Sequence, residues 1–421
     1  METVPTSSSL TPINHAQLQL ELALHQDIQF TNYLINGLRY GFNPLIHPLP
    51  TTSIECNNNY TARKDQAAVS LLVKSEVTKD YVAGPFSTVP YAVYRVSPLG
   101  LAIGKYSQKK RLILDLSAPH DKPEILSINE LFDKDQCSLS YVTIDYAIAI
   151  IANQGRGAKL CKLDISDAFK QVPIANAFIP FFGFKWQQQY YFYKRLVFGC
   201  RSSPKLFDTL SEDLCWILHH NYGIQHILHL LDDFLTIDSP EADAQQTMTN
   251  LPKLFQEMCI PIAEHKTMGP ATTLEYLGIN LDTNTMTASL PQDKLDRISA
   301  LLHEFSQKKK CTKRELLSLL GHLSYACKVI IPGRSFISHL LDIAKSVKKL
   351  HHQRLQRANK ISTCGISFYN SGMACPYSMM LTLPPIRTWT CLPMPLLRSD
   401  SADTFKERGS QRSGQTTYSQ N

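Results

Sequence analysis

The chain has 421 residues, 43% of them hydrophobic, so it can bury a sizeable core over two or three domains. Its eleven cysteines are scattered, odd in number and never in CxxC spacing, which argues against a disulfide framework or zinc site and for a reducing compartment, cytoplasm or nucleus. There is no apolar run of membrane-span length and no secretory signal, so no association with a membrane is expected. A formal net charge of +7 is compatible with a polyanionic partner without proving one.

Residues 1–82 are expected to form a partly helical N-terminal extension. Met1 to Pro12 is rich in Ser, Thr and Pro, a composition typical of disorder. Apolar residues recur at helical spacing over residues 14–41, which predicts one or two short helices. A further helix is predicted over about 61–79, ended by Gly84-Pro85-Phe86.

A basic β-hairpin is predicted around residues 104–110. The segment SPLGLAIGKYSQKKRLILDL passes from a turn-rich start through four basic residues into a strand, Arg111 to Leu116. Such a hairpin can close over a triphosphate, with Arg111 offering a bidentate fork and Lys105 or Lys109 a point charge. Taken in isolation, the same segment is more simply an ordinary exposed basic loop.

The next stretch alternates strands with helices, which indicates a mixed sheet backed by helices. The expected elements are a helix at Tyr141–Ala152, a strand at Lys159–Ile165, strands in the run to Ile174 and in Phe181–Tyr193, and a helix from Ser203-Pro204 to Gly223 with proline in its first turn.

Residues Ile227 to Ile237 read ILHLLDDFLTI, which predicts a hairpin with Asp232 and Asp233 at or beside its turn. Adjacent like charges repel, and a solvated turn is the simplest explanation of an Asp-Asp pair alone. A divalent cation shared with a further carboxylate makes the pair favourable. Asp164 ends an earlier strand, and a sheet can bring it beside the pair. Such a set of carboxylates suits two-metal phosphoryl transfer.

Four segments carry a family resemblance: KLDISDAFKQVPI (162–174), LVFGCRSSPKLFDTL (196–210), HLLDDFL (229–235) and LEYLGINLD (274–282). In this order they resemble the polymerase motifs of reverse transcriptases. More narrowly, SPLG before KKRLILDLSAP and SINE, the upstream NYLINGLRYGF and the leucine before LDD resemble the polymerases of tyrosine-recombinase (DIRS-type) retrotransposons. The resemblance runs from about residue 25 to about 358.

The resemblance implies an α+β right-hand polymerase with fingers, an antiparallel palm sheet backed by helices, and a helical thumb. Residues 83–290 would be fingers and palm, and 291–358 the thumb. It also implies two Mg²⁺ ions, with Mn²⁺ as an alternative metal, and dNTPs as substrates. The partners would be an RNA template, a DNA primer and the RNA–DNA duplex.

Residue by residue, the resemblance implies a metal site with a catalytic lysine, a dNTP-binding site and a primer grip. The metal ligands would be Asp164, Asp232 and Asp233, with Lys266 as the lysine that protonates pyrophosphate or, equally, an ordinary surface lysine. The dNTP-binding residues would be Lys105, Arg111, Phe169, Phe198 and Gly199, with the Phe169 ring excluding a 2′-hydroxyl. The primer grip would comprise Leu274, Tyr276, Leu277 and Gly278. Two residues depart from the retroviral pattern: Leu230 replaces a tyrosine, and Phe198 replaces a glutamine, which puts a side-chain hydrogen bond to the nucleotide in doubt.

Helical segments are predicted at about 291–307, 312–328 and 334–350, the second with a capping box of Thr312 and Glu315. Basic residues near their end would face duplex phosphates, or form a solvated basic face: Lys345, Lys348 and Lys349.

Residues 359–421 lose helical periodicity and are expected to be a divergent, disordered tail. The segment 361–421 contains only three acids, Asp400, Asp403 and Glu407. Ribonuclease H chemistry, which would follow in the resembled family, needs several carboxylates on a folded sheet. A truncated or frame-shifted end without nuclease activity is therefore expected.

Two functions stay open from the sequence. The first is an RNA-directed DNA polymerase of retrotransposon origin. The second is a catalytically silent, nucleic-acid-binding remnant of such a polymerase, against which the presence of all three carboxylates argues. Another two-metal palm enzyme, such as a nucleotide cyclase, would leave the helix after Ser203-Pro204 and the thumb unexplained.

Overall fold

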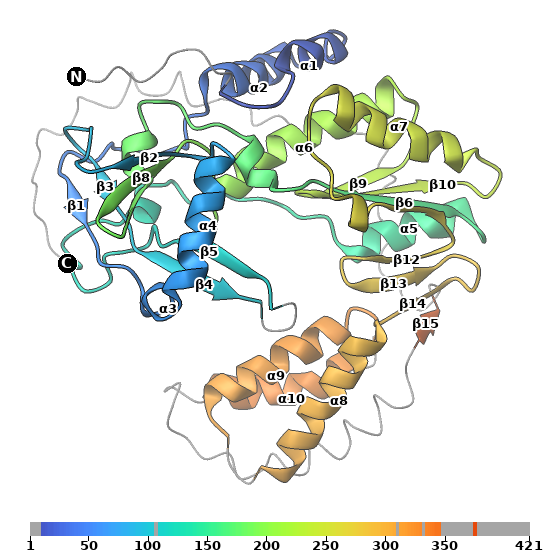
Figure 1. Ribbon diagram of the computed structural model, residues 1–421. Helices are drawn as coiled ribbons and strands as arrows, with labels where there is room; N and C mark the ends of the chain where they lie inside the picture. The colour runs from blue at the N-terminus through green and yellow to red at the C-terminus, as the bar shows by residue number, and fades with distance from the viewer. Residues whose placement is uncertain (1–9, 105–107, 309–310, 331–332, 347–373, 377–421) are drawn as a thin grey trace, which may run out of the picture. The chain divides into compact units, whose positions relative to one another are not determined.

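The computed structural model describes residues 10–104, 108–308, 311–330, 333–346 and 374–376. All of them lie in the first of two units, Met1–Met380, and the second unit, Leu381–Asn421, falls outside the described residues. Within the first unit, helices accompany mostly antiparallel sheets (Figure 1). The expected α+β class is therefore confirmed.

The N-terminal region forms four helices: α1 (His15–Glu21), α2 (Ile28–Tyr40), α3 (Tyr60–Lys64) and α4 (Gln66–Thr78). The first pair occupies the region predicted to be helical. The single helix predicted over 61–79 is two helices, because Asp65 leaves helical geometry and its side chain instead accepts a hydrogen bond from the backbone N–H of Ala68, as an N-cap does.

A five-stranded sheet follows, in the order β1-β3-β7-β8-β2. Its strands are β1 (Ile54–Glu55), β2 (Val82–Phe86), β3 (Arg95–Val96), β7 (Gly183–Trp186) and β8 (Gln189–Tyr193). The basic hairpin is a separate pair, β4 (Leu99–Ile103) with β5 (Lys110–Leu114), so this prediction is confirmed on both sides of residues 105–107, which lie outside the described residues.

The strand predicted in the run to Ile174 is wrong. After strand β6 (Lys159–Asp164) the chain enters a left-handed turn at Asp167 and a short 3-10 helix, Ala168–Gln171. Ile174 then forms only an isolated bridge with Phe42. The β-branched residues of this run serve the core rather than a ladder.

The central sheet has four antiparallel strands in the order β11 (Met268–Ala271), β6 (Lys159–Asp164), β10 (Asp233–Asp238) and β9 (Ile227–Leu230). Because side chains alternate along a strand, Leu163 and Phe234 face one side while Leu160 and Leu235 face the other. Helices α6 (Ser203–His220) and α7 (Ala244–Glu257) share the core of the first side, and α5 (Ile144–Gln154) that of the second (Figure 1). No sequence pattern singled out α7.

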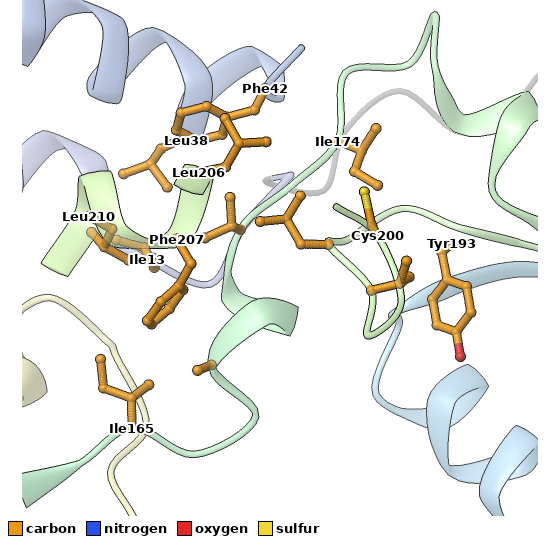
Figure 2. Close-up of a cluster of buried hydrophobic side chains, with 14 of the residues drawn as sticks. Ile13, Leu38, Phe42, Ile165, Ile174, Tyr193, Cys200, Leu206, Phe207 and Leu210 are labelled. Carbon is orange, nitrogen blue, oxygen red and sulfur yellow. The ribbon is translucent and has the colours of Figure 1, made fainter. Parts of the chain in front are cut away.

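The N-terminal region belongs to the core behind the central sheet. Figure 2 shows Leu38 and Phe42 at one side of α6 and Ile165, the residue after β6, at the other. The chain before α1 is tied down by hydrogen bonds, from Thr11 Oγ1 to the Gln171 carbonyl at 2.7 Å and from the Asn14 N–H to the Met258 carbonyl at 2.9 Å. Residues 10–42 therefore support the elements that carry the carboxylates.

A third sheet and three helices complete the described region. The sheet runs β12 (Thr273–Tyr276), β13 (Ile279–Asp282), β14 (Thr287–Ser289) and β15 (Ala374–Pro376), and the helices are α8 (Gln292–Gln307), α9 (Lys313–Ala326) and α10 (Gly333–Ser346). The capping box of Thr312 and Glu315 is confirmed. Apart from β15, the predicted disordered tail lies outside the described residues. Among those that are described, no helix combines the length and apolar character that a membrane span requires.

Helix α6 buries acidic side chains that the sequence pattern did not single out. Asp213 is completely buried and neither of its carboxyl oxygens accepts a hydrogen bond within the described region. Burial raises its pKa to about 8, and the nearby acid Glu212 adds to the shift. Nε2 of His25 lies 3.9 Å from Asp213 Oδ1, and burial lowers the pKa of His25. At neutral pH both groups are therefore held in their uncharged forms.

This burial predicts a pH-dependent stability. The folded-state pKa of Asp213 is raised above the ordinary value of 3.8, so unfolding releases its proton anywhere between pH 3.8 and about 8. Stability should fall as pH rises through this window, by up to about 1.4 kcal/mol per pH unit from this group alone. Asp213→Asn removes the ionisation, so its melting temperature should exceed that of the wild type by more at pH 8 than at pH 6. Equal differences at the two pH values would contradict the assignment. His25 is present in both proteins, so its own titration largely cancels in the comparison.

Candidate active site

The register of the central sheet sets two carboxylates side by side. Asp233, the first residue of β10, is the direct antiparallel partner of Asp164, the last residue of β6. Asp232 lies in the turn just before β10, and its carbonyl accepts a hydrogen bond from the Ile165 N–H at 2.9 Å. The hairpin predicted over residues 227–237 is confirmed, and it brings together the three carboxylates singled out from the sequence.

A side chain of α6 forms a hydrogen bond with the turn that carries Asp232. Leu231 adopts a left-handed conformation with φ of 55°, and its carbonyl accepts a hydrogen bond from Ser211 Oγ at 2.9 Å. Leu230, which replaces the retroviral tyrosine, is half-buried at the end of β9. A left-handed bulky residue is uncommon, so the α6 contact helps to fix a turn that the local sequence does not favour.

Burial makes the carboxylate pair electrostatically costly. It raises the pKa of Asp232, with Asp164 adding to the shift while Lys266 and Arg111 oppose it. Burial likewise raises the pKa of Asp233 to about 6, against the influence of Lys162. A cation bound between these groups would relieve the cost.

Two lysines already balance part of this charge. Lys266 Nζ donates to both carboxylate oxygens of Asp164, at 2.8 and 2.7 Å. Lys162 Nζ lies 3.2 Å from Asp233 Oδ2. Lys266 therefore contacts a predicted metal ligand, whereas its predicted role as a proton donor to pyrophosphate stays a prediction.

The carboxylate oxygens suit a hard divalent cation, although they do not by themselves complete its coordination shell. Carboxylate oxygens are the ligands that Mg²⁺ prefers, and it commonly takes only one or two of them together with substrate phosphates. Asp233 Oδ1 is a buried oxygen without a hydrogen-bond partner in the described region. Within that region, no three His, Cys, Asp or Glu side chains form a preassembled metal cluster. Ligation by Asp164 would require Lys266 to be displaced.

Three aromatic rings, those of Phe169, Phe198 and Phe207, pack together. The half-buried Phe169 packs against Phe198 with ring centroids 5.0 Å apart, and against the buried Phe207 of α6 at 5.7 Å. Phe198 keeps 46% of its surface exposed. The structure thus brings together two predicted nucleotide-binding residues, and Phe198 offers a ring face where the retroviral glutamine offers an amide.

The loop that carries Phe198 approaches the basic hairpin closely at Gly199. Its φ is +102°, and a Cβ atom there would lie 2.3 Å from the carbonyl oxygen of Leu114. Only glycine fits such a position without a shift of the backbone. Arg111, on the same strand as Leu114, is exposed and close enough to influence the pKa of Asp232. Lys105 lies outside the described residues.

Asn129, to which the sequence pattern assigned no role, holds this loop. Its Nδ2 donates to the Gly199 carbonyl at 2.8 Å, and its Oδ1 accepts from the Arg201 N–H at 3.0 Å. The residue is buried within a 3-10 turn, Ile128–Glu130, which has a capping box. The signal available in the sequence was the SINE motif, in which asparagine is the residue that can satisfy a carbonyl and an N–H together.

The family model described as reverse transcriptase (RNA-dependent DNA polymerase) matches residues 105–281. This range contains the three carboxylates, the rings of Phe169, Phe198 and Phe207, and Gly199. The chain carries a reverse transcriptase domain. It is 23% identical over 234 residues to Polyprotein P3 of Commelina yellow mottle virus and 26% identical over 182 residues to the Gag-Pol polyprotein of avian reticuloendotheliosis virus. These matches cover 55% and 41% of this chain but only 11% and 15% of the two polyproteins.

Solved structures share the fold of the domain. The chain is similar to the foamy viral protease-reverse transcriptase in complex with an RNA/DNA hybrid, with a TM-score of 0.60 and 15% identity, over 89% of this chain and 48% of that one. The same foamy viral protein in complex with dsDNA gives a TM-score of 0.57 and 16% identity, over 89% and 74%. The fold is that of a right-hand polymerase, with β11-β6-β10-β9 as its palm sheet.

The hairpin next to the reverse transcriptase palm does not expose the side chains predicted to grip the primer. Leu274 and Tyr276 are buried in the core that α8 and α9 share. Thr273 and Glu275, on the other face of β12, are exposed, and the turn residues Leu277 and Gly278 are half-buried. A primer grip at this hairpin would therefore use its turn and backbone, because strand alternation sends these two side chains inward.

The turn of this hairpin is held by the following helices. Tyr325 of α9 donates its hydroxyl to the Leu277 carbonyl at 2.7 Å, and Lys294 of α8 donates to the Gly278 carbonyl at 2.6 Å. Of the three lysines predicted to face duplex, Lys345 is exposed near the end of α10, and Lys348 and Lys349 lie outside the described residues.

Asn129→Ala tests the anchoring of the reverse transcriptase loop. The change leaves the Gly199 carbonyl and the Arg201 N–H without their partner, so the free energy of unfolding should fall by about 1–3 kcal/mol in denaturant titrations. Asn284→Ala is the matched control, because Asn284 also forms a side-chain hydrogen bond but is exposed, and its loss should cost little. Equal effects of the two changes would show that Asn129 does not hold the loop.

Proposed function

We propose that the chain is an RNA-directed DNA polymerase that extends a DNA primer on an RNA template with dNTPs, and that it derives from a tyrosine-recombinase (DIRS-type) retrotransposon. The observation that carries the activity is the register of β6 and β10, which pairs Asp164 with Asp233 beside Asp232 within a reverse transcriptase domain. The narrower origin rests on the resemblance of the SPLG, KKRLILDLSAP, SINE and NYLINGLRYGF segments.

The proposed reaction joins the primer 3′-oxygen to the α-phosphorus of a dNTP and releases pyrophosphate. Two Mg²⁺ ions, or Mn²⁺, would be held by Asp164, Asp232 and Asp233 and would supply charge neutralisation for the attacking and leaving oxygens. Arg111 would bind the triphosphate through its guanidinium fork. Phe169 and Phe198 would contact the sugar and base.

We assign residues 83–290 to fingers and palm and residues 291–358 to a helical thumb. The foamy viral structures are complexes with dsDNA and with an RNA/DNA hybrid, which supports duplex as the partner of this chain as well. The contacts of Tyr325 and Lys294 with the hairpin turn would join thumb to primer grip. Lys345, at the end of α10, would add phosphate-facing charge.

The metal assignment predicts that Asp164→Asn and Asp232→Asn abolish primer extension on an RNA template with Mg²⁺ or Mn²⁺. Each change removes a charge that the ions require and almost no volume, so the melting temperature and duplex affinity should stay close to wild type. Asp238→Asn is the control, since Asp238 is the last residue of β10 and lies at the end of that strand away from the three carboxylates. Near wild-type extension by either active-site variant would show the metal assignment to be wrong.

The sugar assignment predicts that Phe169→Ala raises the ratio of ribonucleotide to deoxyribonucleotide incorporation. The half-buried ring would occupy the space that a 2′-hydroxyl needs, so its removal opens that space. Phe207→Leu is the control, because Phe207 packs behind the ring and its change alters stability alone. An unchanged ratio in a folded Phe169→Ala protein removes Phe169 from the sugar site.

The silent remnant is the second candidate, and one observation favours it. Both Asp164 and Asp233 are already paired with lysines, so the acidic centre is partly neutralised without a metal. A wild-type chain that binds duplex yet fails to extend primers with either metal would establish this alternative and refute the polymerase.

A further inference from the structure

Lys162 occupies a place in the palm to which the sequence motifs assign no role. It lies on the central strand β6, two residues before Asp164, so strand alternation puts both side chains on the same face. Its Nζ lies 3.2 Å from Asp233 Oδ2 and donates to the Glu275 carbonyl of β12 at 3.4 Å. One ammonium group thus bridges the carboxylate strand and the hairpin of residues 273–282.

The two lysines of the site differ in how freely they can leave it. The side chain of Lys266 is 49% exposed, so solvent or an incoming cation can replace its contact with Asp164. The side chain of Lys162 is only 17% exposed and is enclosed between the sheet and the hairpin. Lys266 is therefore displaceable, whereas Lys162 is a built-in part of the site.

Lys162 also limits what Asp233 can offer to a ligand. With Oδ2 paired to the ammonium group, the remaining oxygen, Oδ1, is buried and has no partner in the described region. The three carboxylates set against the two lysines leave a net charge of −1. Removing the bridge would free the second oxygen of Asp233 and make the centre more negative.

We propose that Lys162 is a positioning residue for the polymerase reaction, which fixes the Asp233 carboxylate to the backbone of Glu275 so that the metal-binding strand and the primer-side hairpin keep one mutual geometry. The proposal rests on the proposed polymerase function. It assigns the hairpin a second anchor, because Lys294 and Tyr325 hold its turn while Lys162 holds the strand before the turn.

It follows that Lys162 should lower the affinity for the metal and raise kcat. A nearby positive charge weakens the binding of a divalent cation, so Lys162 lowers affinity by its charge. By fixing Asp233, it orients the carboxylate for reaction, and groups that orient metal ligands typically change activity by about 10–100-fold. A side chain that merely supported the fold would move both quantities in the same direction.

The test compares Lys162→Met with Lys159→Met, a change of the same chemistry at the start of the same strand, where the side chain is half-buried. Primer extension with saturating duplex gives kcat and the KM for dNTP. A Mn²⁺ titration of each protein without nucleic acid or dNTP, followed by electron paramagnetic resonance, gives the metal dissociation constant independently of activity. Melting temperatures establish that each variant is folded.

For Lys162→Met, kcat should fall about 10–100-fold, while Mn²⁺ should bind at least as tightly as to the wild type. The KM for dNTP should change little, because Lys162 contacts the hairpin proposed to bind the primer and not the residues proposed to bind the nucleotide. Lys159→Met should resemble the wild type in every measurement. Lys162→Arg keeps the charge and the donors, so it should recover most of the lost kcat. Lys162→Gln removes the charge as well, and it would serve in place of Lys162→Met if that variant did not fold.

Two results would overturn the inference: an unchanged kcat in folded Lys162→Met, or a fall in kcat accompanied by weaker Mn²⁺ binding, which would make Lys162 a structural support. An Arg variant no more active than Lys162→Met would overturn it as well. The proposed function fails separately, since a wild-type chain without extension activity refutes both statements, whereas an active wild type with an unaffected Lys162→Met refutes only this one.

Discussion

The antiparallel register between β6 and β10 is the constraint on which the rest of the structure depends. It places Asp233 directly opposite Asp164 in a largely buried setting, where like charges repel strongly. A shift by one residue would turn every side chain of the strand to the opposite face and separate the pair. The surrounding elements therefore serve to hold one register and to balance the charge that it concentrates.

The two faces of the palm divide these tasks. The face with Leu163 and Phe234 is packed by α6, α7 and the N-terminal helices, and it fixes the position of the strands. The opposite face carries Asp164, Asp233 and Lys162, and it is closed farther along by Leu160, Leu235, α5 and the hairpin of β12 and β13. One face thus mainly supports the strands by packing, while the other changes from apolar core to charged centre within one strand.

Local patterns were sufficient for elements whose signals are local. The hairpin around Asp232, the strand ending at Asp164, the helix at Ser203-Pro204 and the capping box of Thr312 all occur as predicted. The misplaced strand before Ile174 and the helix broken at Asp65 have one cause: a single residue leaves the regular backbone, at Asp167 and at Asp65, while apolar periodicity continues past it.

The acids of the site and Lys266 could be predicted from the sequence, but the other residues that contact and hold the site could not. The spacing of Asp164, Asp232 and Asp233 is visible in the sequence, but the contacts of Lys162, Asn129 and Tyr325 depend on register and on loops far apart along the chain. Lys162 in particular looks like an ordinary polar position of an alternating strand. Leu274 and Tyr276 show the opposite case. Their place in the motif predicted contact with the primer, whereas strand alternation directs both side chains into the core.

The packing of the N-terminal residues against α6 means that the unit that folds is larger than the segment that the family model matches. That match begins at residue 105, yet Ile13, Leu38 and Phe42 pack against the helix that holds the carboxylate turn (Figure 2). Replacing residues 105–281 alone during evolution would remove the packing partners of these apolar side chains. The N-terminal segment should therefore be inherited together with the segment that carries the carboxylates. Substitutions at its buried positions should be limited to side chains that still fit the shared core.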